Sequence, residues 1–107
     1  MPQTIRVPYQ KILDAYNSAC PPAGMAKAKM TEARRAKLRT RWKEPEFQEN
    51  YQTLFTKAAA SDFLTGRNDR GWRADFAWLI QSEENYVKVL EGRYDANRKE
   101  VDYSNGF

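Results

Sequence analysis

Residues 63–80 read FLTGRNDRGWRADFAWLI, and the rest of the chain is organised around them. Their first half brackets Asn68 and Asp69 between Gly66 and Gly71, residue types that adopt turn geometries readily, so a loop is expected here. In the second half, apolar residues recur at the spacing of one helix face: Trp72, Phe76, Leu79 and Ile80. This spacing predicts a helix that buries Trp72 in the core. A polar loop held between an apolar anchor and a helix can present side chains to a partner.

The other helices are marked by their start signals. Pro8, Thr31, Pro45 and Ser82 are residue types that begin helices, and apolar residues at helical spacing follow each of them. The expected ranges are about 8–19, 31–43, 46–60 and 82–91, and the third has the most regular apolar face. No segment alternates with a period of two. The predicted class is therefore all-α, a compact bundle of about five helices.

The boundaries of the domain follow from composition. A chain of 107 residues forms one domain, and the helical part is expected to span residues 8–93. Residues 1–7 show no pattern and are expected to be a flexible lead. Residues 94–107 alternate charged and polar side chains, which is typical of a mostly disordered tail. Residues 21–30, with Gly24 and several alanines, are expected to be a linker, part of it frayed.

Charge is concentrated in one segment. Eight basic residues face a single acid, Glu32, between Lys27 and Lys43, within a chain of net charge +4. A basic block on a folded domain indicates a polyanionic partner, either the phosphate backbone of nucleic acid or an acidic protein surface. The alternative is an ordinary solvated helix face, although such faces usually mix both signs of charge.

The residue inventory argues against an enzyme. The chain has no histidine, and its one cysteine, Cys20, cannot form a zinc site or an internal disulfide. It has no phosphate-binding glycine loop and no dinucleotide fingerprint. Asp62, Asp69 and Asp75 could be imagined as a magnesium site for phosphodiester chemistry, but ion pairs or a helix cap explain them more simply. We expect no catalysis, no metal and no cofactor. No apolar run is long enough to cross a membrane.

Nine basic residues are the predicted nucleic-acid contacts. Six lie on or just after the basic helix and three on the loop that follows Phe63: Arg34, Arg35, Lys37, Arg39, Arg41, Lys43, Arg67, Arg70 and Arg73. The helical period puts 34, 37 and 41 on one flank of a Leu38–Trp42 ridge and 35 and 39 on the other. Four or five phosphate contacts on duplex DNA would give a log affinity–log salt slope of about −4. Arginines interleaved with an aromatic in the loop are also typical of single-strand binders.

Several stretches together carry a resemblance to a known family. They read VPY at 7–9, RTRWKE at 39–44, SDFLTGRN at 61–68, GWRADFAWL at 71–79 and VLEGRY at 89–94. They resemble a domain often found at the carboxyl end of phage and prophage replication proteins, of the replisome-organiser or primosomal type, related in role to DnaD and the lambda O initiator. The resemblance covers about residues 7–94. Its specific part is the run from Phe63 to Leu79.

The resemblance implies work at a replication origin in the cytoplasm of a bacterial host. The expected role is an accessory domain of phage DNA replication that binds DNA, single-stranded or without sequence preference. The alternative is a protein-interaction module that recruits the replicative helicase or its loader, with little DNA contact. Members of this family usually carry an amino-terminal winged-helix region. No counterpart of it precedes Val7, so recognition of an origin sequence is not implied.

Overall fold

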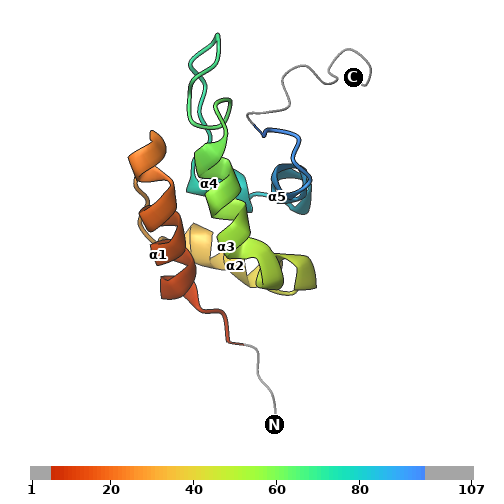
Figure 1. Cartoon of the computed structure of the whole chain (residues 1–107). Coiled ribbons are helices and arrows are strands. Elements are labelled where there is room, and N and C mark those ends of the chain that lie inside the picture. Colours follow the sequence, from red (N-terminus) through yellow and green to blue (C-terminus); the bar gives the residue numbers. More distant parts are fainter. Residues whose placement is uncertain (1–5, 96–107) are drawn as a thin grey trace.

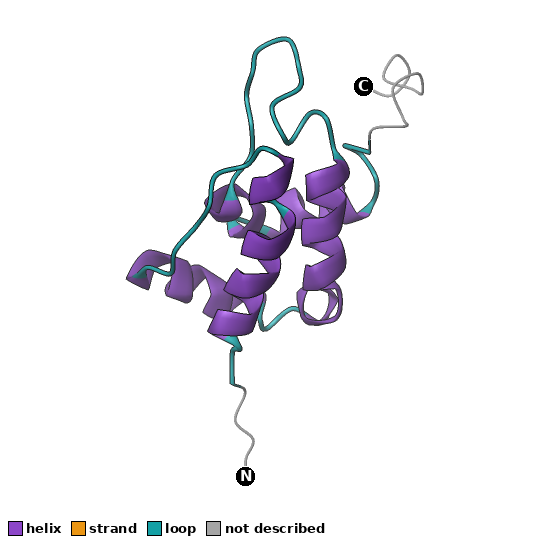
Figure 2. Cartoon of the chain, turned by 60° about the vertical axis from the view of Figure 1, so that its left-hand side comes forward, coloured by secondary structure: helices purple, strands orange, loops and turns teal. Residues whose placement is uncertain are grey.

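The structure is a computed structural model that describes residues 6–95 of the chain. Over this range the chain is helical, with one isolated antiparallel bridge between Thr65 and Arg73 and no longer strand (Figures 1 and 2). The elements are α1 (Tyr9–Ala19), a 3₁₀ turn η1 (Pro21–Ala23), α2 (Glu32–Arg41), α3 (Pro45–Ala60), α4 (Phe76–Ile80) and α5 (Glu83–Leu90). The predicted all-α class with five helices is confirmed.

Local side-chain hydrogen bonds cap the starts of three helices. The side chains of Thr31, Asp75 and Ser82 accept hydrogen bonds from backbone N–H groups three residues ahead, at 3.2, 2.9 and 3.1 Å. Each bond satisfies a donor that the first helical turn leaves without a partner. Pro45 is the first residue of α3, where its missing N–H is not needed. Pro8 directly precedes α1 and makes no side-chain capping hydrogen bond.

The core is built around α3, as the apolar spacing predicted. This helix packs against α1 and α5, and it buries one continuous face: Phe47, Tyr51, Leu54, Phe55 and Ala58. Aromatic rings join the elements across the core, because Tyr16 of α1 meets Phe55 edge-on at 5.7 Å and lies 5.1 Å from Phe76 of α4. Fully buried aromatic side chains of this size contribute most of the burial available to a small domain. α2 lies at the edge of this core and contacts α4.

The helix predicted from Trp72 begins later. α4 starts at Phe76, and Trp72 lies in the preceding loop with 37% of its surface exposed, so its predicted burial in the core is wrong. The physical reason is hydrogen bonding. Asp75 adopts an extended conformation and caps the helix, while Arg73 pairs with Thr65 in the isolated bridge. The backbone at Arg73 and Asp75 is therefore held in a non-helical conformation before the helix begins. Trp78 of α4 is half-buried against the core.

The linker over residues 21–30 is held to α1 rather than frayed. The hydroxyl of Tyr16 donates to the carbonyl of Ala26 at 2.6 Å. The side chain of Asn17 both donates to and accepts from the backbone of Ala28, at 2.9 Å in each direction. Met25 is buried in the core. These contacts fix the path of the chain between α1 and α2.

Both expected boundaries move outward. Val7, predicted to belong to the flexible lead, packs partly against the core. Tyr94, predicted to start the tail, stacks on Phe63 with ring centroids 5.5 Å apart, and Asp95 forms an ion pair with Lys57 at 3.3 Å. Residues 1–5 of the lead and 96–107 of the tail lie outside the described residues. None of the described helices has the length and apolar character needed to cross a membrane.

Candidate nucleic-acid interface

The basic residues of α2 surround a narrow apolar stripe. Leu38 and Arg41 are buried against the core and Trp42 is half-buried, so the remaining circumference of the helix faces outward. The two flanks of this stripe each border a surface hollow. One hollow lies between α2 and the start of α1, and the other lies between α2 and α4.

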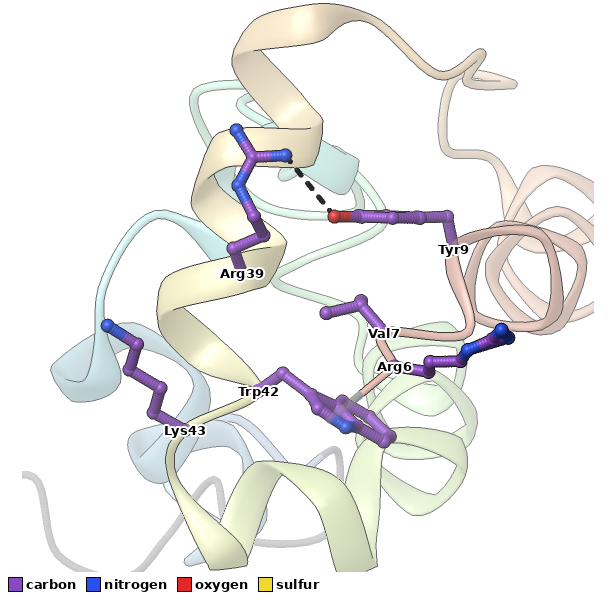
Figure 3. Close-up of a pocket in the computed structure, with 6 residues that line it drawn as sticks. All are labelled: Arg6, Val7, Tyr9, Arg39, Trp42 and Lys43. Atoms are coloured by element: carbon purple, nitrogen blue, oxygen red, sulfur yellow. Dashed lines mark hydrogen bonds between the residues drawn. The ribbon is translucent and has the colours of Figure 1, made fainter. Parts of the chain in front are cut away.

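The first hollow, which we call the basic groove, has a volume of about 540 Å³. Its lining residues come from the chain before α1, from α1 and from the end of α2: Arg6, Val7, Tyr9, Arg39, Trp42 and Lys43. Figure 3 shows Val7 beside the Trp42 ring, with the charged ends of Arg6 and Lys43 directed outward on opposite sides. Among residues 6–95 this lining contains three cations and no carboxylate. An apolar floor with a cationic border suits a chain of phosphates bearing planar bases.

Tyr9 orients two of the arginines of α2. The guanidinium of Arg39 donates to the Tyr9 hydroxyl at 3.3 Å, and the guanidinium of Arg35 lies over the Tyr9 ring, 5.2 Å from its centroid. Arg39 also approaches the carboxylate of Glu32 at 3.8 Å, a long and exposed contact. Such an exposed pair contributes little to stability and is easily exchanged for a phosphate. Both arginines are therefore available at the surface, with their directions restrained.

The second hollow carries the other flank. Arg34 and Lys37 line it together with Ala77, Ile80 and Gln81, and its volume is about 320 Å³. Arg34 donates to the backbone carbonyl of Lys29 at 2.9 Å, and no carboxylate lines this hollow. Lys37 is exposed and has no ion pair among the described residues. The basic surface thus continues around α2 on both sides of its buried stripe.

Arg41 does not belong to that surface, and its predicted role as a contact is wrong. Only 8% of the residue is exposed, and its guanidinium pairs with Glu44 at 3.3 Å. The same carboxylate group accepts a hydrogen bond from the Tyr86 hydroxyl at 2.7 Å. The cause is position, because residue 41 lies three after Leu38 on the core side of α2. Arg41 joins the turn between α2 and α3 to α5.

The three loop arginines differ in their availability. Arg67 forms an ion pair with Asp62 at 3.1 Å, and Arg73 donates to the carbonyl of Gly24 at 2.9 Å, which ties the loop to the linker after α1. The side chain of Arg70 has no such partner within residues 6–95 and lines a hollow beside Trp72. The structure therefore separates the loop from the basic groove. The loop follows the last turn of α3, at the opposite end of that helix from the turn that joins α2 to α3 (Figure 1). Lys43 of the groove belongs to that turn.

The sequence did not single out the Arg6 cation or the Tyr9 hydroxyl of the basic groove as contacts. Arg6 lies in the segment expected to be a flexible lead, and Tyr9 is one of the apolar residues that follow Pro8. Neither carried a signal of its own, because the groove forms only when the chain before α1 lies along α2. Packing between segments far apart in the chain, such as those of Tyr9 and Arg39, thirty residues apart, creates it.

The described residues contain no cluster of three or more histidine, cysteine or acidic side chains able to hold a metal ion. Cys20 is buried, and its thiol donates to the carbonyl of Phe55 at 3.4 Å. Burial raises the pKa of the Cys20 thiol to about 12, so at neutral pH it is a protonated core group and not a nucleophile. The chemistry that this surface offers is charge and aromatic contact.

Comparisons of the chain with protein-family models, with curated proteins and with solved structures found no match.

Proposed function

We propose that this chain is a non-catalytic accessory domain of phage DNA replication that binds DNA through the two flanks of α2. The observation that carries the proposal is the basic groove, where Arg6, Arg39 and Lys43 border an apolar floor and none of the described lining residues is a carboxylate. The replication context comes from the sequence resemblance over residues 7–94. It would place the domain in the cytoplasm of a bacterial host.

The charge arrangement favours phosphate over a mixed protein surface. Arg35, Lys37 and Lys43 are exposed, and none of them forms an ion pair among the residues described. A protein interface with many charges usually alternates their signs to gain specificity, whereas nucleic acid presents one sign only. Basic side chains on both flanks of one helix suit a backbone that runs across it. Contacts of this kind position the domain on DNA without reading its sequence.

The proposal is tested with labelled oligonucleotides, single-stranded and duplex, titrated at low salt and followed by fluorescence anisotropy. The variant K37E/K43E reverses one unpaired charge on each flank of α2. We expect it to weaken binding of both oligonucleotides by at least about tenfold, because two attractions become repulsions. Thermal stability should change little, since both side chains are exposed.

The matched control is K57E/K88E, which alters net charge equally at two lysines of α3 and α5. These lysines already have carboxylate partners, Asp95 and Glu84, and neither is among the described residues that line the hollows beside α2. The control should bind DNA within about threefold of the wild type. Equal loss in both variants would mean that net charge alone matters. No loss in K37E/K43E would favour the alternative, a module that docks the replicative helicase or its loader, and a pull-down with that helicase would then be the direct measurement.

A further inference from the structure

Four aromatic side chains form a closed ring of contacts at the loop end of the molecule. They come from the loop, from α4 and from the chain after α5, and we call them the aromatic platform: Phe63, Trp72, Trp78 and Tyr94. Centroid distances around the ring are 5.2 Å for 63–72, 5.6 Å for 72–78, 6.0 Å for 78–94 and 5.5 Å for 94–63. Each ring therefore touches two others.

Two members of the aromatic platform, Phe63 and Trp72, face outward. Phe63 is 44% exposed and Trp72 is 37% exposed, and they are the exposed large apolar side chains of residues 6–95. Trp78 and Tyr94 are half-buried and support them from the side of the core. Phe63 and Trp72 also line an open hollow of about 790 Å³ together with Asn68, Asp69 and Arg70. Small-molecule sites have volumes of about 300–1,000 Å³, so the hollow is large enough for a base.

The platform is held in place before any ligand arrives. The Asn68 side chain donates to the carbonyls of Phe63 and Trp72, at 2.8 and 2.6 Å. Its oxygen accepts from the N–H groups of Arg70 and Trp72, at 3.0 and 3.2 Å. The loop that carries the exposed rings is therefore braced across its width. A preorganised aromatic surface loses little conformational freedom when it binds.

We propose that the aromatic platform is a stacking site for unpaired bases of single-stranded DNA. Phe63 and Trp72 offer ring surface to successive bases, and the guanidinium of Arg70, which has no ion pair within residues 6–95, meets the adjoining phosphate. This inference rests on the proposed DNA-binding function and adds a strand preference to it. A duplex cannot use the platform, because its bases are already covered by their neighbours in the stack.

Residues 62–75 carry three arginines and three aspartates, so the loop has no net charge. Within residues 6–95, however, Arg70 and Arg73 have no carboxylate partner, so their guanidinium groups favour an anionic occupant. Asp69 also lines the hollow and offsets part of the Arg70 charge, so stacking must supply most of the affinity gained there. An aromatic surface of this kind also suits a protein partner, since tryptophan and tyrosine are frequent interface anchors. The experiment below distinguishes a protein partner from single-stranded DNA.

The experiment measures binding of a labelled oligo-dT strand and of an abasic strand with the same length and charge. Trp72→Leu removes the ring and Trp72→Phe keeps one, so the pair separates aromatic stacking from simple apolar bulk. We expect W72L to weaken oligo-dT binding about five- to a hundredfold and W72F to stay within about threefold of the wild type. Binding of the abasic strand and of a duplex should be unchanged in both variants. Oligo-dT should also quench the intrinsic tryptophan fluorescence of the wild type, and W72F should lose most of that quench.

Three results would overturn the inference. One is an oligo-dT affinity of W72L equal to that of the wild type, which would point to a protein partner for the platform. Another is an equal loss on the abasic strand, which would show that the loop acts through charge or shape. The third is a wild type that binds abasic strand as tightly as oligo-dT. The proposed function fails separately, when K37E/K43E keeps its duplex affinity, because none of Phe63, Trp72 and Arg70 lines either hollow beside α2.

If W72L proves less stable than the wild type, Phe63→Leu supplies the same test at the neighbouring ring. Phe63 is the more exposed of the two side chains. Loss of oligo-dT binding in F63L with retained abasic binding supports the inference, and unchanged oligo-dT binding overturns it.

Discussion

The side chain of Asn68 forms hydrogen bonds with both backbone polar groups of Trp72. Its oxygen accepts from the Trp72 N–H at 3.2 Å, and its amide nitrogen donates to the Trp72 carbonyl at 2.6 Å. The same carboxamide reaches the backbone of Phe63 and Arg70. One side chain thus replaces the ladder of hydrogen bonds that a hairpin would use, and it keeps an exposed loop in one conformation.

Removing that brace should open the loop without unfolding the domain. Asn68→Ala leaves several backbone groups to water, and we expect the free energy of unfolding to fall by about 1 kcal/mol. Limited trypsin digestion reports the opening directly, because Arg67, Arg70 and Arg73 are cleavage sites in the loop. Cleavage there should become several times faster.

Asn17→Ala is the matched control for this experiment, because Asn17 holds the backbone of Ala28 in the same two-way manner. It should accelerate cleavage at Lys27 and Lys29 and leave the loop sites unchanged. If N68A left the loop sites as resistant as in the wild type, the brace would be unimportant.

Substitution of Arg41 should affect stability and not DNA binding. Arg41→Ala leaves Glu44 without its cation, and we expect a loss of about 1–3 kcal/mol, less than the roughly 3–5 of a fully buried pair, because the Glu44 side chain is 24% exposed. Urea unfolding followed by circular dichroism gives this value. At temperatures where the variant is folded, its affinity for DNA should match that of the wild type. A folded R41A that lost DNA binding selectively would restore Arg41 to the interface.

Two loop glycines should respond differently to a side chain. Gly66 has φ +97°, and a Cβ there would lie 2.9 Å from Nε of Arg73, so Gly66→Ala should cost about 1–3 kcal/mol. Gly71 has φ +70° and nothing within 4 Å of an added Cβ. Asparagine tolerates that left-handed geometry better than other side chains, so Gly71→Asn should cost only about 0.5–1 kcal/mol, less than Gly66→Ala. Melting temperatures measured side by side check the pair. Similar shifts in both variants would show that loop geometry does not constrain Gly66.

Stability should decline in alkaline solution. Burial raises the pKa of Cys20 from its ordinary value of 9.0 to about 12, so the folded protein keeps a proton that the unfolded chain has lost above pH 9.0. This contribution is fully present below pH 9.0 and is lost as the pH rises towards 12, with a slope of at most about 1.4 kcal/mol per pH unit. Burial also raises the pKa of Tyr16 and Tyr86, which add to the decline above pH 10.

Urea unfolding at pH 7–10.5 measures the alkaline decline, and Cys20→Ala isolates the thiol. The variant should lose some stability at pH 7, because a buried group is removed, but its curve should be flatter between pH 9 and 10. Identical slopes for the variant and the wild type in that interval would show that the thiol does not titrate as its burial requires.

The parts of the fold that sequence predicted are those with local causes. Thr31 and Ser82 cap their helices because a hydroxyl followed by a free N–H is sufficient. The apolar face of α3 was evident because its period needs no distant partner. Trp72 was misplaced because two signals competed. Trp72 has helical spacing to Phe76, but the hydrogen bonds of Asn68 hold it in the loop. The spacing of apolar residues does not reveal those bonds.

The basic surface also has parts that the sequence predicted and parts that depend on distant contacts. The two flanks of α2 follow from the helical period and lie on the two hollows that border it. The burial of Arg41 depends on Glu44 and Tyr86, and the groove beside Tyr9 depends on the path of Arg6 and Val7. These are contacts between segments far apart in the chain. Charge counts along a sequence cannot separate a paired arginine from a free one.

The most direct test of the central claim is the dependence of duplex DNA affinity on salt. About four phosphate contacts give a slope of log affinity against log salt of about −4, and each contact contributes about 0.9. K37Q/K43Q should reduce the magnitude of that slope by about 1.8, while K57Q/K88Q, with the same loss of charge, should leave it unchanged. A slope near zero for the wild type, or the same slope for all three proteins, would contradict DNA binding through α2.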